Sequence, residues 1–414
     1  MSDGQRLAAD IVKKLVEAGY TAYFAGGWVR DFMMGHPSDD IDIATNAPPE
    51  VILDMFPRTI AVGISFGVVV VLLEGHQFEV ATFRKDVSYK NGRTPHEIEL
   101  STPYEDALRR DFTINGMFYD PLEHVVHDFV NGAEDIKRGV IRSIGNPHER
   151  FYEDRLRMIR AVRFSARFGF PIDNETREAI RAHAQTLFPP VAMERVWQEL
   201  VKMSKFPHFD QALIEMHRLE LLQEILPALR SLHLQEIKER VRHFAEYPKE
   251  TPTILYVMML FPDIMLDEVE PLCRWLRISV QEIRIAKFLV HCRERVKAEE
   301  QLQLADAVEW VHLYASPYAQ LCLGLIASPL EEQEKAAFIQ KHRQRRQALD
   351  GHVQRAIEKK PLISAAKLLE AGIPEGKKMG LLLKEAERIA IIENIENATL
   401  LMEKLKSTSL WGDA

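Results

Sequence analysis

Runs of residues rich in Val, Ile and Phe, which are typical of β-strands, are confined to the first third of the chain. The pattern predicts a strand over 21–25, two strands over 60–73 and 78–83 that meet at a tight turn, a hairpin over 117–130 and a short strand over 140–144. From residue 146 onward apolar positions recur with helical spacing, and no later segment has the character of a strand. The sequence therefore predicts an α+β fold, in which a small mixed or antiparallel sheet with helices precedes an all-α remainder.

The same periodicity predicts amphipathic helices over 5–18, 49–56, 105–112, 149–170 and 191–203. Between residues 84 and 102 the chain is polar, with Asn91-Gly92 as a turn signal, so we expect a long loop there. Beyond residue 206, breaks near Pro262, Pro329 and Pro361 separate further helices.

The composition is that of an ordinary globular protein: 414 residues, of which 46% are hydrophobic and 28% are charged. No apolar run approaches the roughly 20 residues that a membrane span requires, and the first residues lack the basic and apolar regions of a signal peptide. We therefore expect a cytoplasmic protein with no membrane partner. The three cysteines lack zinc-ligand spacing, so they are predicted to be reduced core residues.

A net charge of −8 argues against uniform affinity for nucleic acid. Arginine is nevertheless dense between residues 150 and 167, and a second basic cluster covers 341–346. Basic patches on an acidic body are compatible with RNA binding. For the second cluster, a solvated charged face is the better interpretation.

Asp40 and Asp42 are two residues apart, so in an extended strand both carboxylates leave the same face. Two carboxylates at this spacing suit Mg²⁺, which shares its coordination with water and substrate phosphates. The glycine pair Gly26-Gly27 lies between a predicted strand and a predicted helix, where backbone N–H groups can approach a phosphate. Taken singly, the first pattern is most often a solvated loop and the second a simple turn.

Asp154, Arg157, Arg160 and Arg163 recur every three residues, so one helix face is expected to carry all of them. Without further information, exposed ion pairs are the better explanation of such a stripe. Its chemistry permits a sharper one. Cytosine and adenine each present an exocyclic amine beside a ring-nitrogen acceptor, so a carboxylate and a guanidinium together select these two bases and reject uracil and guanine.

Several motifs together resemble one family. The chain carries GGWVRD followed by DDID, then RRDFTING, EDRLR and RAVRF. This set is similar to the nucleotidyltransferase superfamily, in particular to tRNA CCA-adding enzymes and bacterial poly(A) polymerases. The resemblance is specific over about the first 205 residues. It implies a catalytic head or palm over 1–142, a nucleotide-recognition neck over 143–205, a helical body over 206–345 and a helical tail over 346–414.

The resemblance also implies residue roles. Two Mg²⁺ ions would be held by Asp40 and Asp42, and Glu79 on a neighbouring strand is the candidate third catalytic carboxylate, with a solvent-facing strand position as the equal alternative. Nucleotide binding is expected of Gly26, Gly27, Arg30, Arg110, Asp154, Arg157, Arg160 and Arg163. The substrates would be CTP, ATP and the 3′ end of a tRNA or another RNA. The His residues after residue 205 form no adjacent His-Asp pair, so an appended phosphohydrolase module is not expected.

The stretch 84–95 resembles the flexible loop of CCA-adding enzymes through Arg84, Asp86, Tyr89, Arg93 and Pro95. Two positions depart from the family pattern: Val87 stands where a glycine is usual, and Asn91 where an aspartate is usual. The resemblance implies that this loop takes part in the switch from C to A, so the departures bear on which bases are added.

The sequence thus predicts a template-independent RNA 3′-terminal nucleotidyltransferase that completes CCA ends by a two-metal mechanism. The nearest alternative is a poly(A) polymerase or an enzyme that adds only A or only CC; the length of the loop argues against CC alone. A small-molecule nucleotidyltransferase would have no reason to carry the arginine stripe. An inactive RNA-binding scaffold would not need Asp40, Asp42, Arg110 and Asp154.

Overall fold

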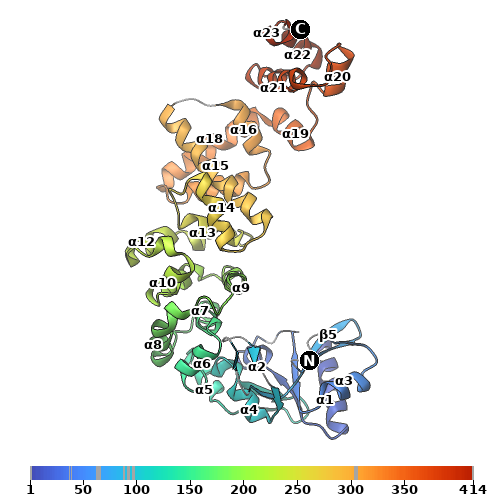
Figure 1. Ribbon diagram of the computed structural model, residues 1–414, viewed down its shortest axis with the longest axis vertical. Helices are drawn as coiled ribbons and strands as arrows, with labels where there is room; N and C mark the ends of the chain where they lie inside the picture. Colours follow the sequence, from blue (N-terminus) through green and yellow to red (C-terminus); the bar gives the residue numbers. More distant parts are fainter. Residues whose placement is uncertain are drawn as a thin grey trace. The chain divides into compact units, whose positions relative to one another are not determined.

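A computed structural model describes residues 2–36, 38, 40–61, 67–86, 89–90, 94–95, 98–302 and 306–412. The chain forms two compact units, residues 1–245 and 246–414 (Figure 1). The first unit holds the sheet and the second is helical, which confirms the α+β prediction. The finer division at 142, 205 and 345 stays a prediction.

The central sheet of the first unit has seven strands in the order β11-β10-β1-β2-β5-β4-β3 within the described residues. The β2–β5 pair is parallel and the other pairs are antiparallel, so the sheet is mixed, as predicted. The strands are β1 Ala22–Ala25, β2 Asp42–Thr45, β3 Thr59–Ile60, β4 Val68–Leu73, β5 His76–Thr82, β10 Met117–Asp120 and β11 Val125–Asp128.

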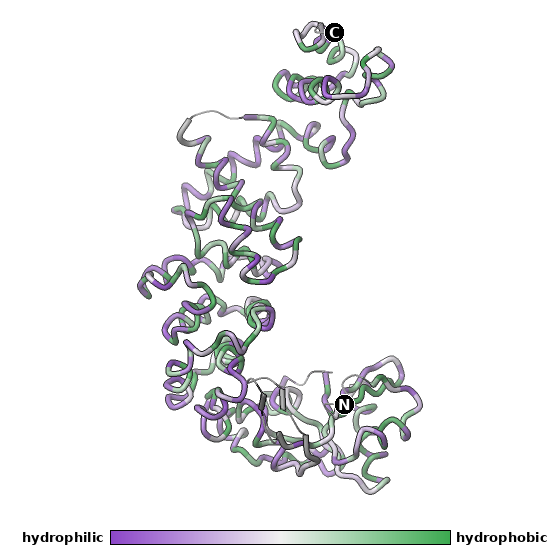
Figure 2. Tube along the Cα trace, in the orientation of Figure 1, coloured by the Kyte–Doolittle hydropathy of each residue, from purple (hydrophilic) through white to green (hydrophobic). Residues whose placement is uncertain are grey.

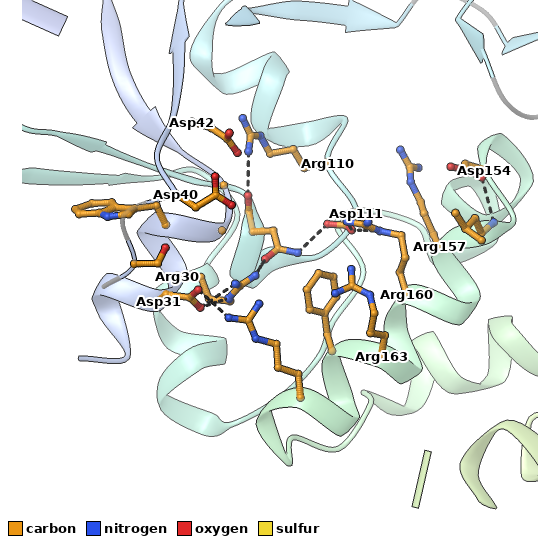
Figure 3. Close-up of a pocket in the computed structure, with 18 of the residues that line it drawn as sticks. Arg30, Asp31, Asp40, Asp42, Arg110, Asp111, Asp154, Arg157, Arg160 and Arg163 are labelled. Atoms are coloured by element: carbon orange, nitrogen blue, oxygen red, sulfur yellow. Dashed lines mark hydrogen bonds and ion pairs between the residues drawn. The ribbon is translucent and has the colours of Figure 1, made fainter. Parts of the chain in front are cut away.

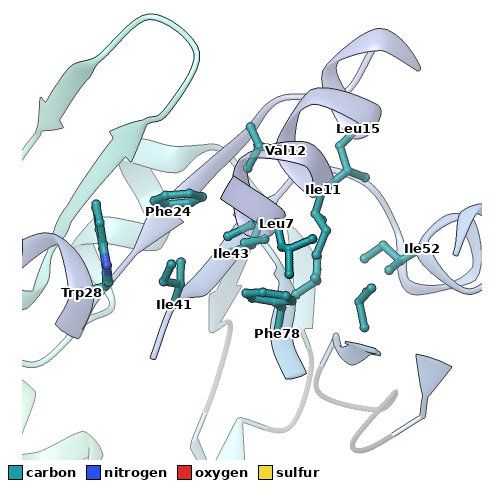
Figure 4. Packing of buried hydrophobic residues seen from close by; sticks show 14 of the residues in the cluster. Leu7, Ile11, Val12, Leu15, Phe24, Trp28, Ile41, Ile43, Ile52 and Phe78 are labelled. Atoms are coloured by element: carbon teal, nitrogen blue, oxygen red, sulfur yellow. The ribbon is translucent and has the colours of Figure 1, made fainter. Parts of the chain in front are cut away.

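One face of this sheet is covered by an apolar core. Helix α1 (Asp3–Glu17) begins with a capping box between Ser2 and Gln5 and buries Leu7, Ile11 and Leu15 against the strands (Figure 4). Each such side chain contributes roughly 1.5–3 kcal/mol by leaving water. Two short helices, α2 (Gly27–Met33) and α3 (Pro49–Met55), join this core through Trp28 and Ile52. The core fixes β1, which the glycine pair follows, and β2, which begins at Asp42.

The remaining helices of the first unit follow the sheet. They are α4 Pro103–Leu108, η2 Thr113–Asn115, α5 Gly132–Arg138, α6 Pro147–Glu153, α7 Leu156–Phe168, α8 Asn174–His183, η3 Ala184–Thr186, α9 Met193–Met203, α10 Phe209–Arg218, α11 Leu221–Ile225, η4 Pro227–Leu229 and α12 Leu234–Val241. A short turn, η5 Phe244–Glu246, leads to the second unit. Figure 2 shows hydrophobic and hydrophilic residues alternating along the helices, as their predicted amphipathic pattern requires.

The second unit contains α13 Thr253–Met259, α14 Leu266–Trp275, α15 Val280–Leu302, α16 Ala307–Tyr314, α17 Ala319–Ala327, α18 Glu332–Ala348, α19 Asp350–Glu358, α20 Ala365–Glu370, α21 Lys377–Ile392, α22 Ala398–Lys406 and α23 Ser409–Gly412. In the basic cluster on α18, Lys341 and Arg345 both pair with Glu299, and His342 is buried, so the solvated-face interpretation holds only in part. The three cysteines are free and buried, as predicted. Across the described residues, no helix is long and apolar enough to span a membrane.

The single strand predicted over 60–73 is instead two strands, β3 and β4, which pair antiparallel. Three further local predictions are wrong. Residues 140–144 form no strand, because Ile141 and Ser143 make only isolated bridges, to Ile172 and Phe112. The stretch 84–102 is not simply a loop: β6 (Arg84–Asp86) pairs with β9 (Ile98–Leu100), and β7 (Tyr89–Lys90) pairs with β8 (Thr94–Pro95). Backbone pairing of this kind needs no apolar alternation, so the pattern could not reveal it. Val87, Asn91 and Arg93 lie outside the described residues.

The last wrong prediction is the single helix over 149–170. The chain instead forms α6 and α7, with Asp154 in an extended conformation (φ −142°, ψ 104°) at the end of α6. The carboxylate of Asp154 accepts a hydrogen bond from the N–H of Leu156, the first residue of α7, at 3.1 Å. The extended backbone of Asp154 thus interrupts the three-residue periodicity that predicted one helix face.

Candidate active site

A cavity of about 700 Å³ lies in the first unit, between the sheet and α7. It is lined by ten of the predicted residues: Gly26, Gly27, Arg30, Asp40, Asp42, Arg110, Asp154, Arg157, Arg160 and Arg163. Figure 3 shows Asp40 and Asp42 on one side of the pocket, Asp154 and Arg157 on the other, and further arginines between them. The volume is within the range of small-molecule sites.

The glycine pair makes the tight connection between β1 and α2. Gly26 has φ +66° and ψ −129°, a backbone conformation that residues other than glycine rarely adopt. A Cβ atom at this position would lie 3.2 Å from Arg110 Nη1 and 3.7 Å from Asp42 Oδ2. Gly26 therefore permits both the turn and the close approach of these two charged side chains.

The carboxylate end of the pocket consists of Asp40 and Asp42. Asp42 is the first residue of β2, both side chains are exposed to the pocket, and neither makes an ion pair with another described residue. The surrounding protein raises the pKa of Asp42 to about 6, through partial burial first and then repulsion from Glu79 and Asp40, with Arg110 opposing. This local excess of negative charge fits a divalent cation.

The described residues hold no group of three or more His, Cys, Asp and Glu side chains that could bind a metal. A metal ion on Asp40 and Asp42 would therefore complete its coordination shell with water and ligand oxygens, as Mg²⁺ commonly does. Glu79, on β5, is exposed and does not line the pocket, although it is near enough to raise the pKa of Asp42. Its catalytic role stays a prediction.

Arg110 follows α4 and reaches back toward the carboxylate end. Its Nε and Nη2 atoms donate to Asp106 Oδ2 at 3.1 and 3.0 Å, and its guanidinium lies 4.9 Å from the Phe118 ring. Burial alone would raise the pKa of Asp106, but Arg110 and Arg109 outweigh burial and lower it. The pairing holds Arg110 beside Gly26 while its Nη1 faces Asp42 across that glycine.

The arginine cluster, formed by Arg30, Arg157, Arg160 and Arg163, is held by carboxylates. Arg160 donates to Asp111 Oδ2 from both Nε (2.8 Å) and Nη2 (2.5 Å). Burial opposes ionisation of Asp111, yet Arg160 and Asn115 lower its pKa to about 2. Asn115 also accepts a hydrogen bond from Arg30 Nη1 at 2.6 Å. Arg160 and Arg30 are therefore linked through Asp111 and Asn115, and the cluster is not a solvated stripe.

Arg157 is 9% exposed, and its guanidinium is fixed by Glu153 Oε2 at 2.8 Å and by the carbonyl oxygen of Arg109 at 2.9 Å. Asp154 makes its ion pair elsewhere, with Arg195 Nη2 at 3.1 Å. Asp154 and Arg157 both line the pocket.

Sequence reasoning missed six residues that hold the site: Asp31, Asp111, Asn115, Arg167, Arg195 and Glu199. Asp111 and Asn115 belong to the RRDFTING motif, so their place in the site was within reach of the sequence. Arg195 and Glu199 are four residues apart in the predicted helix over 191–203, which gave only a weak signal.

Comparisons with known proteins agree on the kind of domain. A family model described as "Poly A polymerase head domain" matches residues 22–142. A second model, "Probable RNA and SrmB- binding site of polymerase A", matches residues 169–232. The pocket-lining residues up to Asn115 all fall within the first match.

Whole-chain relatives carry one name. The chain is 31% identical to the CCA-adding enzyme of Ligilactobacillus salivarius, over 98% of this chain and 96% of that one. It is 44% identical to the CCA-adding enzyme of Enterococcus faecalis over 197 residues, which are 47% of this chain and 48% of that one. A crystal structure of the Bacillus stearothermophilus CCA-adding enzyme in complex with CTP is 27% identical, with a TM-score of 0.77 over 98% of this chain and 99% of that one.

Proposed function

Because this chain belongs to the family of CCA-adding enzymes, which are nucleotidyltransferases, we propose that it adds C and A to the 3′ end of tRNA from CTP and ATP. The 3′-hydroxyl oxygen forms a bond to the α-phosphorus of the nucleotide, the bond to the β-phosphate breaks, and pyrophosphate leaves. No nucleic-acid template takes part. The observation that carries the proposal is one pocket lined by Asp40 and Asp42 at one end and by Asp154 and Arg157 at the other.

Asp40 and Asp42 are the residues that would hold Mg²⁺. When bound, two such ions lower the pKa of the attacking hydroxyl and stabilise the charge that develops on the departing pyrophosphate. Arg110 adds a fixed positive charge beside Gly26, at the edge of the carboxylate end. Bidentate contact between guanidinium and phosphate oxygens is strong and directional, so Arg110 is suited to orient the triphosphate.

Base selection falls to Asp154 and Arg157. The carboxylate accepts from the amine of cytosine or adenine, and the guanidinium donates to the adjacent ring nitrogen. Uracil and guanine present the opposite polarity, and each mispaired buried polar group costs about 1–3 kcal/mol. Arg157 is already fixed by Glu153 and the Arg109 carbonyl, so little side-chain freedom is lost when a base binds.

The arginines at 30, 160 and 163 lie between these two ends. Their carboxylate and amide partners fix each guanidinium. The remaining N–H groups can donate to the ribose and phosphates of the nucleotide. The pocket is thus preorganised for an anionic ligand, because its guanidinium groups are already held in place by their partners.

The test uses the full chain, a tRNA that lacks its terminal CCA, Mg²⁺ and labelled CTP or ATP. Wild-type protein should extend the 3′ end with C, C and A, and the double variant Asp40→Asn, Asp42→Asn should not. Asp54→Asn, which removes an exposed carboxylate of α3 outside the pocket, is the matched control. Extension by the double variant at the wild-type rate would refute the assignment of the two carboxylates.

A poly(A) polymerase is the second candidate, because the matching head-domain model carries that description. Product lengths separate the two: a CCA-adding enzyme stops after three nucleotides on tRNA, whereas a poly(A) polymerase extends generic RNA with ATP alone.

A cytoplasmic location is also part of the proposal, and three free thiols in the described residues support it.

A further inference from the structure

Helix α9 supplies two charged residues that pair with residues lining the nucleotide pocket, and one of the two, Arg195, lines the pocket itself. Arg195 and Glu199 are one helical turn apart, so they occupy one face of α9. Arg195 Nη2 donates to Asp154 Oδ2 at 3.1 Å, and Glu199 Oε2 accepts from Arg163 Nε at 2.5 Å. One face of this helix therefore sets the side chains of two residues that line the pocket.

Asp154 depends on such support because its backbone belongs to no helix. It sits in extended conformation at the junction of α6 and α7, where neighbouring turns do not restrict its side chain. Its Oδ1 atom accepts from the Leu156 N–H at 3.1 Å, and its Oδ2 atom accepts from Arg195. Among the described residues, Arg195 is the cation that pairs with Asp154. Removal of Arg195 leaves the carboxylate with a single backbone contact.

We infer that Arg195 is the positioning residue that sets the orientation of Asp154 for base selection. The inference rests on the proposed function, in which Asp154 reads the exocyclic amine. Each oxygen of Asp154 keeps a lone pair after these contacts, so the carboxylate can accept from a base amine while Arg195 holds it. Arg157 is fixed independently, through Glu153 and the Arg109 carbonyl. Arg195 therefore controls one half of the base-reading pair and leaves the other half unchanged.

Fold stability alone does not account for Arg195. Its ion pair with Asp154 is partly exposed, at 24% and 21% of the two side chains, so it adds little to stability. Its Nη1 atom is buried and has no hydrogen-bond partner among the described residues, which itself costs free energy. The pair is thus a weak stabiliser placed where the direction of a carboxylate matters.

The test measures kcat and KM for each of CTP, ATP, UTP and GTP on a tRNA that lacks its CCA end. We expect Arg195→Gln to raise KM for CTP and ATP about tenfold, and to lower the selectivity for CTP over UTP and for ATP over GTP by about tenfold, the size of one lost hydrogen bond to a charged group. The value of kcat at saturation should change much less. Arg195→Lys should restore selectivity, because the contact seen in the structure uses one nitrogen.

Arg155→Gln is the matched control. Arg155 is next to Asp154 in sequence but donates to Thr186 and to the Tyr152 carbonyl, and it does not line the pocket. Its loss removes the same charge from a residue adjacent to Asp154 without removing a contact to the Asp154 carboxylate, so it should leave selectivity unchanged. Thermal unfolding of all variants separates misfolding from misorientation. If Arg195→Gln does not fold, Arg195→Met, which keeps the aliphatic packing, replaces it in the same assay.

A folded Arg195→Gln or Arg195→Met protein with wild-type selectivity would overturn the inference, as would an equal loss of kcat for all four nucleotides. Asp154→Asn distinguishes the two levels of the argument. If Asp154→Asn also leaves selectivity unchanged, the proposed base-reading role of Asp154 has failed. If Asp154→Asn changes selectivity and the Arg195 variants do not, only the role of Arg195 has failed. In the double variant Asp154→Asn, Arg195→Gln, the effects of the two substitutions on selectivity should be markedly less than additive.

Discussion

The carboxylate end of the pocket and the arginine cluster treat charge in opposite ways. Asp40 and Asp42 are exposed and repel one another and Glu79, and the pKa of Asp42 rises to about 6. In the arginine cluster, Arg160 is paired with Asp111, and the pKa of Asp111 falls to about 2. The comparison shows how one cavity can be prepared for a cation in one part and for an anion in another.

The physical reason is that a cation and an anion require sites with a different balance of charge before they bind. A divalent cation binds most strongly where negative charge is not yet balanced. Buried guanidinium groups without counter-charges would destabilise the fold, so they are held by carboxylates and offer only their remaining hydrogens. Removal of a carboxylate should therefore lower activity at the carboxylate end of the pocket and stability in the arginine cluster.

The largest effect is expected from Asp42→Asn. Loss of one of the two carboxylates should lower the rate of nucleotide addition by at least about a hundredfold, as for other groups that stabilise developing charge. The melting temperature should stay the same or rise, because the substitution relieves repulsion with Asp40 and Glu79. Primer extension and thermal unfolding measure the two quantities. A large loss of stability would contradict the description of this end as uncompensated.

Asp111→Asn should have the reverse signature. Removal of the buried counter-charge leaves Arg160 unpaired, and the free energy of unfolding should fall by about 3 kcal/mol. Urea denaturation measures this loss, and nucleotide affinity should fall with it. Asp135→Asn is the control, because Asp135 is equally buried and bonds Thr113 and Arg142 outside the pocket. It should lower stability and leave nucleotide affinity intact.

Gly26→Ala tests the close approach of Arg110 and Asp42 at Gly26. The positive φ at Gly26 should cost about 1–3 kcal/mol of stability in any other residue, and the new Cβ would displace Arg110. We expect weaker nucleotide binding as well as lower stability. Gly75→Ala carries a similar strain at φ +84°, in the turn between β4 and β5, with no atom near the new Cβ. If Gly75→Ala impairs nucleotide binding equally, strain alone explains the result.

The smallest effect is in the pH dependence of stability, which should have opposite signs at the two ends. Asp111 has a folded-state pKa of about 2, below the unfolded value of about 3.9, so its stabilising contribution is present above pH 4 and lost as pH falls toward 2. Asp42 has a folded-state pKa of about 6, above the unfolded value, so its ionisation lowers stability as pH rises from about 4 to 6.

Unfolding with urea in the presence of a chelator measures these slopes. Asp42→Asn should remove the decline between pH 4 and 6, and Asp111→Asn should reduce the decline below pH 4. Identical profiles for Asp42→Asn and wild type between pH 4 and 6 would contradict the raised pKa of Asp42.

Local sequence determined much of this protein. Apolar runs placed β1, β4 and β5, and the hairpin predicted over 117–130 corresponds to β10 and β11. Ten predicted site residues line one cavity, since each belongs to a short motif whose strand, turn or helix is set by neighbouring residues. The helical character of everything after residue 146 was also local information.

Tertiary structure alone decided which charges meet. Asp154 was expected on the face of one helix with Arg157, but it ends α6, accepts from the Leu156 N–H and pairs with Arg195, 41 residues away. The three-residue spacing of the arginines is equally consistent with a solvated stripe, and only packing buries Arg157 and Arg163 and assigns partners such as Asp111 and Glu199. Periodicity records which side chains share a face, whereas ion pairing depends on which faces the fold brings together.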